Sequence, residues 1–134
     1  YQSSTQNISV NTATKVQFQT KEFDTASCYD NTTNYRFTPN VAGYYQVNCS
    51  VRLNGTNGSG ESLIFIYKNG SIYAVGTDSV TNTMYGFTIS TLVDLNGTTD
   101  YIELYGYNNG SPTLATFYGV IWGTFLSGVL VRAA

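Results

Sequence analysis

Residues 45–53 have the sequence YQVNCSVRL, and this stretch decides the class of fold. Every second residue from Tyr45 to Leu53 is apolar or aromatic, and the residues between them are polar. An alternation with period two places the two sets of side chains on opposite faces of an extended strand. We therefore predict a β-strand here, with one face against a core and a polar face outward.

Runs with a similar pattern recur along the chain, with turn signals between them. They occupy residues 15–19, 63–67, 85–93, 101–107, 117–122 and 125–131. Both alternating sets are apolar in 63–67, so this strand is expected to be buried on both sides. Asn-Gly dipeptides, which favour two-residue hairpin turns, begin at Asn54, Asn57, Asn69, Asn96 and Asn109.

No stretch combines a helical apolar period with good helix formers, whereas Thr, Val, Ile and Tyr abound. Eight to ten short strands separated by turns predict an all-β sandwich or barrel. The 134 residues contain no linker and no internal repeat, so we expect one domain over residues 1–134. It is interpreted as the C-terminal head of a longer fibrous protein.

The chain is poor in charge and rich in aromatic residues. Charged residues make up 10% of it, against about 25% in soluble domains generally. The net charge is −2 and the six Lys and Arg form no cluster, which argues against nucleic-acid binding. No run of 18 apolar residues occurs, so membrane insertion is not expected.

Residues for catalysis or metal binding are scarce. The absence of His removes the commonest general base and most zinc sites. We predict no enzyme, no cofactor and no metal, although a Glu22–Asp24 carboxylate pair would serve a glycan-degrading enzyme. Asp24, Asp30 and Asp78 would bind calcium if the fold brought them together. Cys28 and Cys49 either pair or remain free thiols.

Four motifs, in order, carry a resemblance to a known family. In residues 29–45, YDNTTNYRFTPNVAGYY, the matching positions are Tyr29, Phe37, Val41, Gly43 and Tyr45. The others are YKNG at 67–70, VDLNGTTDYIEL at 93–104 and TFLSGVL at 124–130. Together these motifs resemble the globular head of complement C1q.

The resemblance implies a C1q/TNF-like jelly-roll sandwich of about ten antiparallel strands that forms a homotrimer. The Asn/Thr/Gly-rich, charge-poor style is similar to C1q-like domains of bacteriophage structural proteins. The expected function is a non-enzymatic binding or decoration head of a virion fibre that recognises a host-surface receptor or glycan. A structural trimerisation head of a bacterial collagen-like surface protein is the alternative. The expected location is the virion, or else the cell surface or extracellular space.

Two sets of residues are candidates for contacts with partners. Part of an aromatic cluster belongs to the core, and the rest is expected to form the trimer interface because lone monomers rarely expose large apolar patches. This cluster consists of Tyr101, Tyr105, Tyr107, Phe117, Tyr118 and Trp122. Polar loops at 55–60, 77–83 and 108–112 are expected to touch a receptor or glycan. Their candidate contact residues are Asn57, Ser59, Asp78, Asn82, Asn108 and Asn109.

Overall fold

The computed structural model describes residues 1–54, 60–79, 84–110 and 114–134. These residues form eleven strands and no helix, so the prediction of an all-β chain is confirmed. The strands are β1 (Gln6–Ser9), β2 (Thr14–Lys15), β3 (Tyr29–Asp30), β4 (Arg36–Phe37), β5 (Gly43–Asn54), β6 (Glu61–Lys68), β7 (Ser71–Ser79), β8 (Met84–Leu95), β9 (Ile102–Asn108), β10 (Leu114–Phe117) and β11 (Phe125–Ala133). Within the described ranges no helix is long and apolar enough to cross a bilayer.

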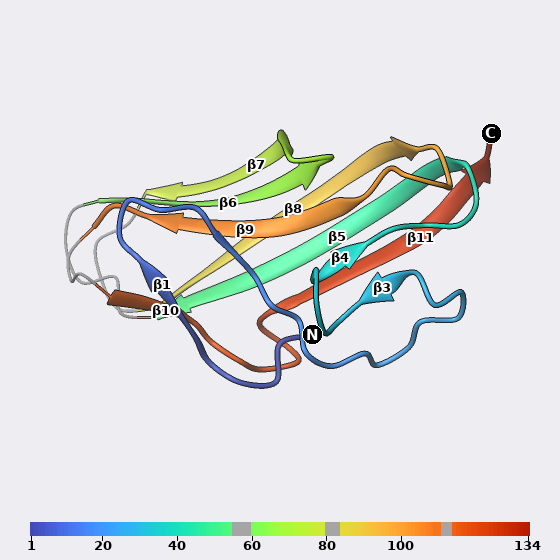
Figure 1. The fold of residues 1–134 in the computed structure, drawn as a ribbon. Coiled ribbons are helices and arrows are strands. Elements are labelled where there is room, and N and C mark those ends of the chain that lie inside the picture. Colours follow the sequence, from blue (N-terminus) through green and yellow to red (C-terminus); the bar gives the residue numbers. More distant parts are fainter. Residues whose placement is uncertain (55–59, 80–83, 111–113) are drawn as a thin grey trace.

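The strands form two antiparallel sheets that pack face to face as a sandwich (Figure 1). Sheet A has the order β1-β10-β5-β11, and β8 pairs with β5 along its second edge. Sheet B has the order β3-β4-β9-β6-β7, and β2 pairs with β9. The chain passes repeatedly from one sheet to the other, so strands that are neighbours in sequence often lie in different layers.

Strand β5 is the centre of sheet A, and its predicted alternation is confirmed. Its inward residues, from Tyr45 to Leu53 in steps of two, are at most 5% exposed. They pack against inward residues of β8 and, across the sandwich, against Ile64 and Ile66 of β6. Complete burial of a side chain such as Leu53 contributes about 1.5–3 kcal/mol, so this row supplies much of the core's stability.

The prediction that residues 63–67 are buried on both sides of the strand is confirmed at Ile64, Phe65 and Ile66, whereas Leu63 and Tyr67 on the outer face are only half-buried. Phe65 of β6 is 9% exposed on the outer face, while Ile64 and Ile66 are fully buried on the inner face. The Asn69–Gly70 turn that follows joins β6 to β7 with Lys68 opposite Ser71. Both turn residues have positive φ, 52° and 79°, as a two-residue hairpin of this twist requires.

The expected strand over 117–122 is wrong beyond its first residue. Strand β10 ends at Phe117, and the chain then turns, with the N–H of Thr124 donating to the carbonyl of Val120. A Cβ on Gly119 would lie 2.4 Å from the carbonyl carbon of Ser4, so the close approach requires glycine. Periodicity alone does not separate an apolar turn from a strand, and Trp122 in this turn is 67% exposed.

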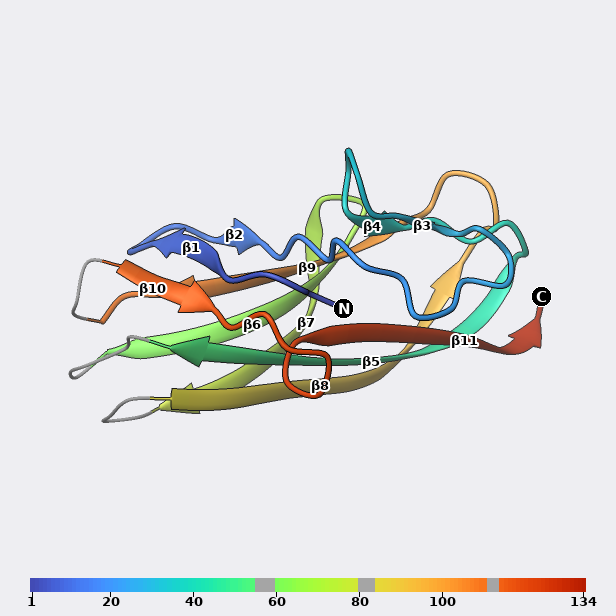
Figure 2. The ribbon, with the colours of Figure 1, turned by 90° about the horizontal axis from the view of Figure 1, so that it is seen from below.

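Strand β11 occurs where the sequence predicts it, but much of it is exposed. It pairs with β5 and ends the strand order of sheet A. Val129 and Val131 are 59% and 61% exposed. The amino terminus lies beside the beginning of this strand (Figure 2), where the N–H of Gln2 donates to the carbonyl of Thr124.

Two motif glycines lie where backbone segments meet at the start of β5. A Cβ on Gly43 would lie 2.2 Å from the carbonyl oxygen of Arg132 in β11. Gly97 has a φ of 71°, and a Cβ there would lie 2.4 Å from the carbonyl carbon of Val41. Both positions therefore require glycine.

Candidate functional site

The outer face of sheet B carries a cluster of aromatic and charged side chains. Tyr105 of β9 stacks on Tyr67 of β6, with ring centroids 4.3 Å apart and planes at 22°. The ammonium of Lys15 lies 5.8 Å from the centroid of Tyr105. Nearby, the guanidinium of Arg36 lies 4.4 Å from the ring centre of Tyr101. The ring faces in this cluster thus already have partners within the same chain.

A nearly buried ion pair lies within this cluster. The Lys15 Nζ atom is 2.6 Å from Oε1 of Glu103, whose side chain is only 7% exposed. The hydroxyl of Tyr105 donates to the other carboxylate oxygen. Burial alone would lower the pKa of Lys15, but the hydrogen bond and negative charge of Glu103 outweigh it and raise that pKa. Lys15 therefore remains charged at neutral pH.

The outer face of sheet A carries large apolar side chains that are partly exposed, as Ile72 and Val75 are on sheet B. Residues paired directly across antiparallel strands share a face. Gln46 pairs with Leu92 of β8 on one side and with Val129 of β11 on the other. Leu92 and Val129 are 49% and 59% exposed, and Tyr44, two residues before Gln46, is 44% exposed. We call Tyr44, Leu92 and Val129 the apolar strip.

A ladder of uncharged polar side chains borders the apolar strip. The Gln46 Nε2 group donates to Oγ of Ser90 at 3.0 Å, and this hydroxyl donates to Oδ1 of Asn48 at 2.8 Å. These bonds fix the side chains in one arrangement. The middle of this face is consequently uncharged, and Asp94 and Arg132 lie beside Tyr44 at one end of it.

The turn after β10 lies at the other end of this face. The guanidinium of Arg52, an outward residue of β5, lies 4.8 Å from the ring centre of Trp122 and 5.5 Å from that of Tyr118. The hydroxyl of Thr124 holds the turn by donating to the carbonyl of Tyr118. Tyr118 and Trp122 thus extend the outer surface of sheet A.

The six aromatic residues predicted for an interface therefore do not share one surface. Tyr101, Tyr105 and Tyr107 lie on the β9 side of sheet B, and Tyr118 and Trp122 lie beside sheet A. Phe117 is fully buried in the core, so its assignment to an interface is corrected: it has no surface to offer a partner. The sequence analysis did not identify the apolar strip. The available signal was that its residues are apolar at outward strand positions whose neighbours on the same face are mostly polar.

The candidate receptor loops begin and end together at one end of the sandwich. Asn54 at the end of β5 pairs with Met84 at the start of β8, and Ser62 pairs with Asn108 at the end of β9. Asn57, Ser59 and Asn82 lie outside the described residues. Asp78 lies on β7 opposite Ser62, and nothing is described of its side chain.

Two Asn residues at this end have distinct roles. Asn108 is only 1% exposed, and its Oδ1 accepts from the Ser62 hydroxyl and the N–H of Gly110. Its assignment as a receptor contact is therefore corrected to a structural one. The exposed Asn109 accepts the N–H of Glu61 through its side chain, which ties the start of β6 to the end of β9.

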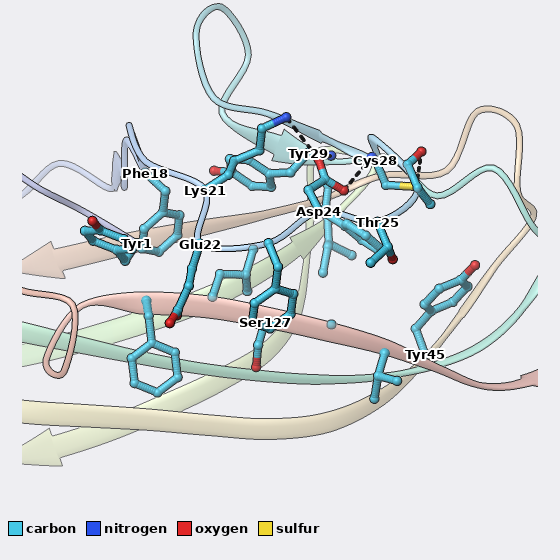
Figure 3. Close-up of a pocket in the computed structure, with 18 of the residues that line it drawn as sticks. Tyr1, Phe18, Lys21, Glu22, Asp24, Thr25, Cys28, Tyr29, Tyr45 and Ser127 are labelled. Carbon is cyan, nitrogen blue, oxygen red and sulfur yellow. Dashed lines mark hydrogen bonds and ion pairs between the residues drawn. The ribbon is translucent and has the colours of Figure 1, made fainter.

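The segment with Glu22 and Asp24 is irregular and borders a pocket (Figure 3). The pocket has a volume of about 770 Å³ and lies between this segment and β11. Burial would raise the pKa of Asp24, but backbone N–H groups of Cys28 and Tyr29 and the Lys21 ammonium together lower it. Because both of its carboxylate oxygens accept hydrogen bonds from this segment, Asp24 stabilises the loop.

The described residues contain no group of three or more Cys, Asp or Glu side chains that would hold a metal ion. Asp30 accepts the backbone N–H groups of Thr32, Thr33 and Asn34, which hold its pKa far below the usual value. The carboxylates of Asp24 and Asp30 are thus both used to order loops. Cys28 and Cys49 are free thiols, and burial raises the pKa of Cys49 to about 12.

Comparison with known proteins gives no family assignment. No protein-family model matches the chain, and no curated protein shows significant similarity to it. What is established is an all-β sandwich of two antiparallel sheets.

Proposed function

We propose that this chain is a non-enzymatic binding head that acts as a homotrimer on a virion fibre or appendage and recognises a host-surface receptor or glycan. The sheet order and the motif segments support a C1q/TNF-like jelly roll as its fold. In that arrangement the outer face of sheet A provides the interface, and the loops at the far ends of β5 and β9 provide the contacts with the receptor.

The observation that carries this proposal is the apolar strip. Its three side chains are 44–59% exposed, while the aromatic rings on sheet B already contact cations and one another. An outward apolar row beside an uncharged polar ladder supports contact with a second copy, because the cores of interfaces are depleted of charged residues. Closed packing of three copies would remove the row from water.

The receptor-binding role follows from trimerisation and from the composition of the loops. Loops rich in Asn, Ser, Thr and Gly form adaptable hydrogen bonds, and each single contact with a glycan is weak. Three copies held in one orientation multiply such contacts, which raises the overall affinity by about 10²–10⁴ when the geometry permits simultaneous binding.

A glycan array tests recognition, with a Leu92→Asp variant as the monomeric control. We expect the unmodified protein to bind a defined set of glycans and the variant to lose most of that signal through lost avidity. If the array stays silent for both proteins, and cells of potential hosts also fail to bind them, the receptor role is wrong. The structural trimerisation role then becomes the better account.

A further inference from the structure

Strands β8 and β11 flank β5 on the outer face of sheet A (Figure 1). Residues paired directly across antiparallel strands share a face, so the registers arrange the outward residues of these three strands in rows. Three successive rows, each running from β8 through β5 to β11, consist of Asp94, Tyr44 and Arg132; of Leu92, Gln46 and Val129; and of Ser90, Asn48 and Ser127. Each row therefore has one residue on the β8 side of this face and one on its β11 side.

The two ends of each row match in chemistry. The first row ends in opposite charges, a carboxylate on β8 and a guanidinium on β11. The second row ends in two aliphatic side chains, Leu92 and Val129, and the third ends in two hydroxyl groups. The β8 side and the β11 side of this face are therefore complementary to each other, level by level along the strands.

The charges of the first row do not pair within one copy. Asp94 and Arg132 are both exposed, and neither forms an ion pair with any residue in the described ranges. Tyr44 lies between them and is 44% exposed. The Lys68 ammonium donates to the backbone carbonyl of Asp94, but its ion pair is with Asp100. One negative and one positive group thus remain available to a partner at the same level.

A rotation axis parallel to the strands makes use of this match. Such an axis keeps every residue at its own level, and it places the β8 side of one copy beside the β11 side of the next when the sheet A faces turn toward it. The contact is heterologous and closes into a ring. Asp94 then faces Arg132, and Leu92 faces Val129. A two-fold axis perpendicular to the sheet would instead place β8 beside β8 or β11 beside β11, and the match would be lost.

We propose that copies of this chain join the β8 side of one sheet A face to the β11 side of the next, with an ion pair between Asp94 of one copy and Arg132 of its neighbour. This inference rests on the proposed homotrimer and specifies how its copies are oriented. The Leu92–Val129 contact lies beside the ion pair and shields it from water. The ion pair fixes the register, because a shifted arrangement leaves both charges without partners.

Charge reversal tests the ion pair. Asp94→Arg or Arg132→Asp alone places like charges at every contact, so each should raise the protein concentration at which half the chains are trimeric by about tenfold or more. The double variant restores opposite charges and should return this concentration to near that of the unmodified chain. Glu61→Arg, the same reversal at an exposed position of sheet B, is the control and should change nothing. Sedimentation velocity over a dilution series measures all four.

A mixture of the two single variants distinguishes a contact between copies from one within a copy. In a trimer that contains both variants, two of the three contacts oppose unlike charges, so the mixture should associate more strongly than either variant alone. Both side chains are exposed, so every variant should keep the near-ultraviolet circular dichroism of the folded chain. Single variants that associate like the unmodified trimer, or a mixture no stronger than its components, would overturn this pairing and leave the trimer standing. An unmodified chain that stays monomeric would overturn both.

Discussion

Glu103 shows how single residues decide the surface of sheet B. It occupies an outward position of β9, yet its side chain is 7% exposed, because Lys15 and the Tyr105 hydroxyl enclose it. A carboxylate buried to this extent is stable only with such partners, since an unpaired one carries a large desolvation cost. The tyrosines around it therefore form part of a polar network as well as an aromatic surface.

Replacement of this carboxylate should weaken the fold. We expect Glu103→Gln to lower the free energy of unfolding by about 1.5–3 kcal/mol, the range for a hydrogen bond to a charged group. Chemical denaturation measures the change. Glu61→Gln, at an exposed position, is the matched control and should stay within about 0.5 kcal/mol of the unmodified chain. Equal effects of the two variants would show that the ion pair contributes nothing.

Asp24 gives a prediction for pH dependence. Its pKa in the folded chain is lowered, so its contribution to stability is present above its unfolded pKa and is lost as pH falls through the folded value. We expect the stability difference between the unmodified chain and Asp24→Asn to shrink on going from about pH 6 to about pH 3. Thermal unfolding at several pH values measures it, and a constant difference would exclude the carboxylate as the cause.

At the scale of strands, the period-two pattern predicted the side chains that face the core better than it predicted the outward side chains and the turns. The inward rows of β5 and β6 were predictable because an apolar residue at every second position fits one buried face. The shared face of Tyr101, Tyr105 and Tyr107 was predictable for the same reason. Periodicity did not reveal that Phe117 ends a strand and that Trp122 lies in the turn after it, where Gly119 approaches the backbone of Ser4 closely.

The exposure of β11 could not be predicted from the sequence either. A run such as Phe125–Val131 looks like a central buried strand, but burial depends on how many neighbours a strand has in its sheet. That property belongs to the topology: β11 ends sheet A, and its outer edge stays free among the described strands. Similarly, the apolar strip depends on the register that brings Leu92, Gln46 and Val129 into one row.

The two outer faces of the sandwich allow a matched comparison. Leu92 on sheet A and Ile72 on sheet B are exposed aliphatic residues, at 49% and 56%. If the proposed trimer forms through sheet A, we expect Leu92→Asp to give monomers, because it would bury an unpaired charge in each interface. Ile72→Asp should leave the proposed trimer intact. Size-exclusion chromatography of both variants measures the outcome, and dissociation caused only by Ile72→Asp would place the interface on sheet B.

In the whole molecule, the residues that stabilise one copy are different from those that we propose contact partners. The core between the sheets and the Lys15–Glu103 pair hold one copy together, and neither depends on a second copy. The apolar strip contributes nothing to the core, and under the proposed function its side chains would be covered by contact between copies. Three rigid sandwiches joined through this face would present their loops in one direction, which suits a head on a fibre.

The molar mass in solution tests this account most directly. Light scattering coupled to size-exclusion chromatography, at micromolar concentration, should give three times the 14.7 kDa of one chain. The mass should stay constant on several-fold dilution. A mass of 14.7 kDa across the same concentrations would contradict the trimer and the binding head built from it.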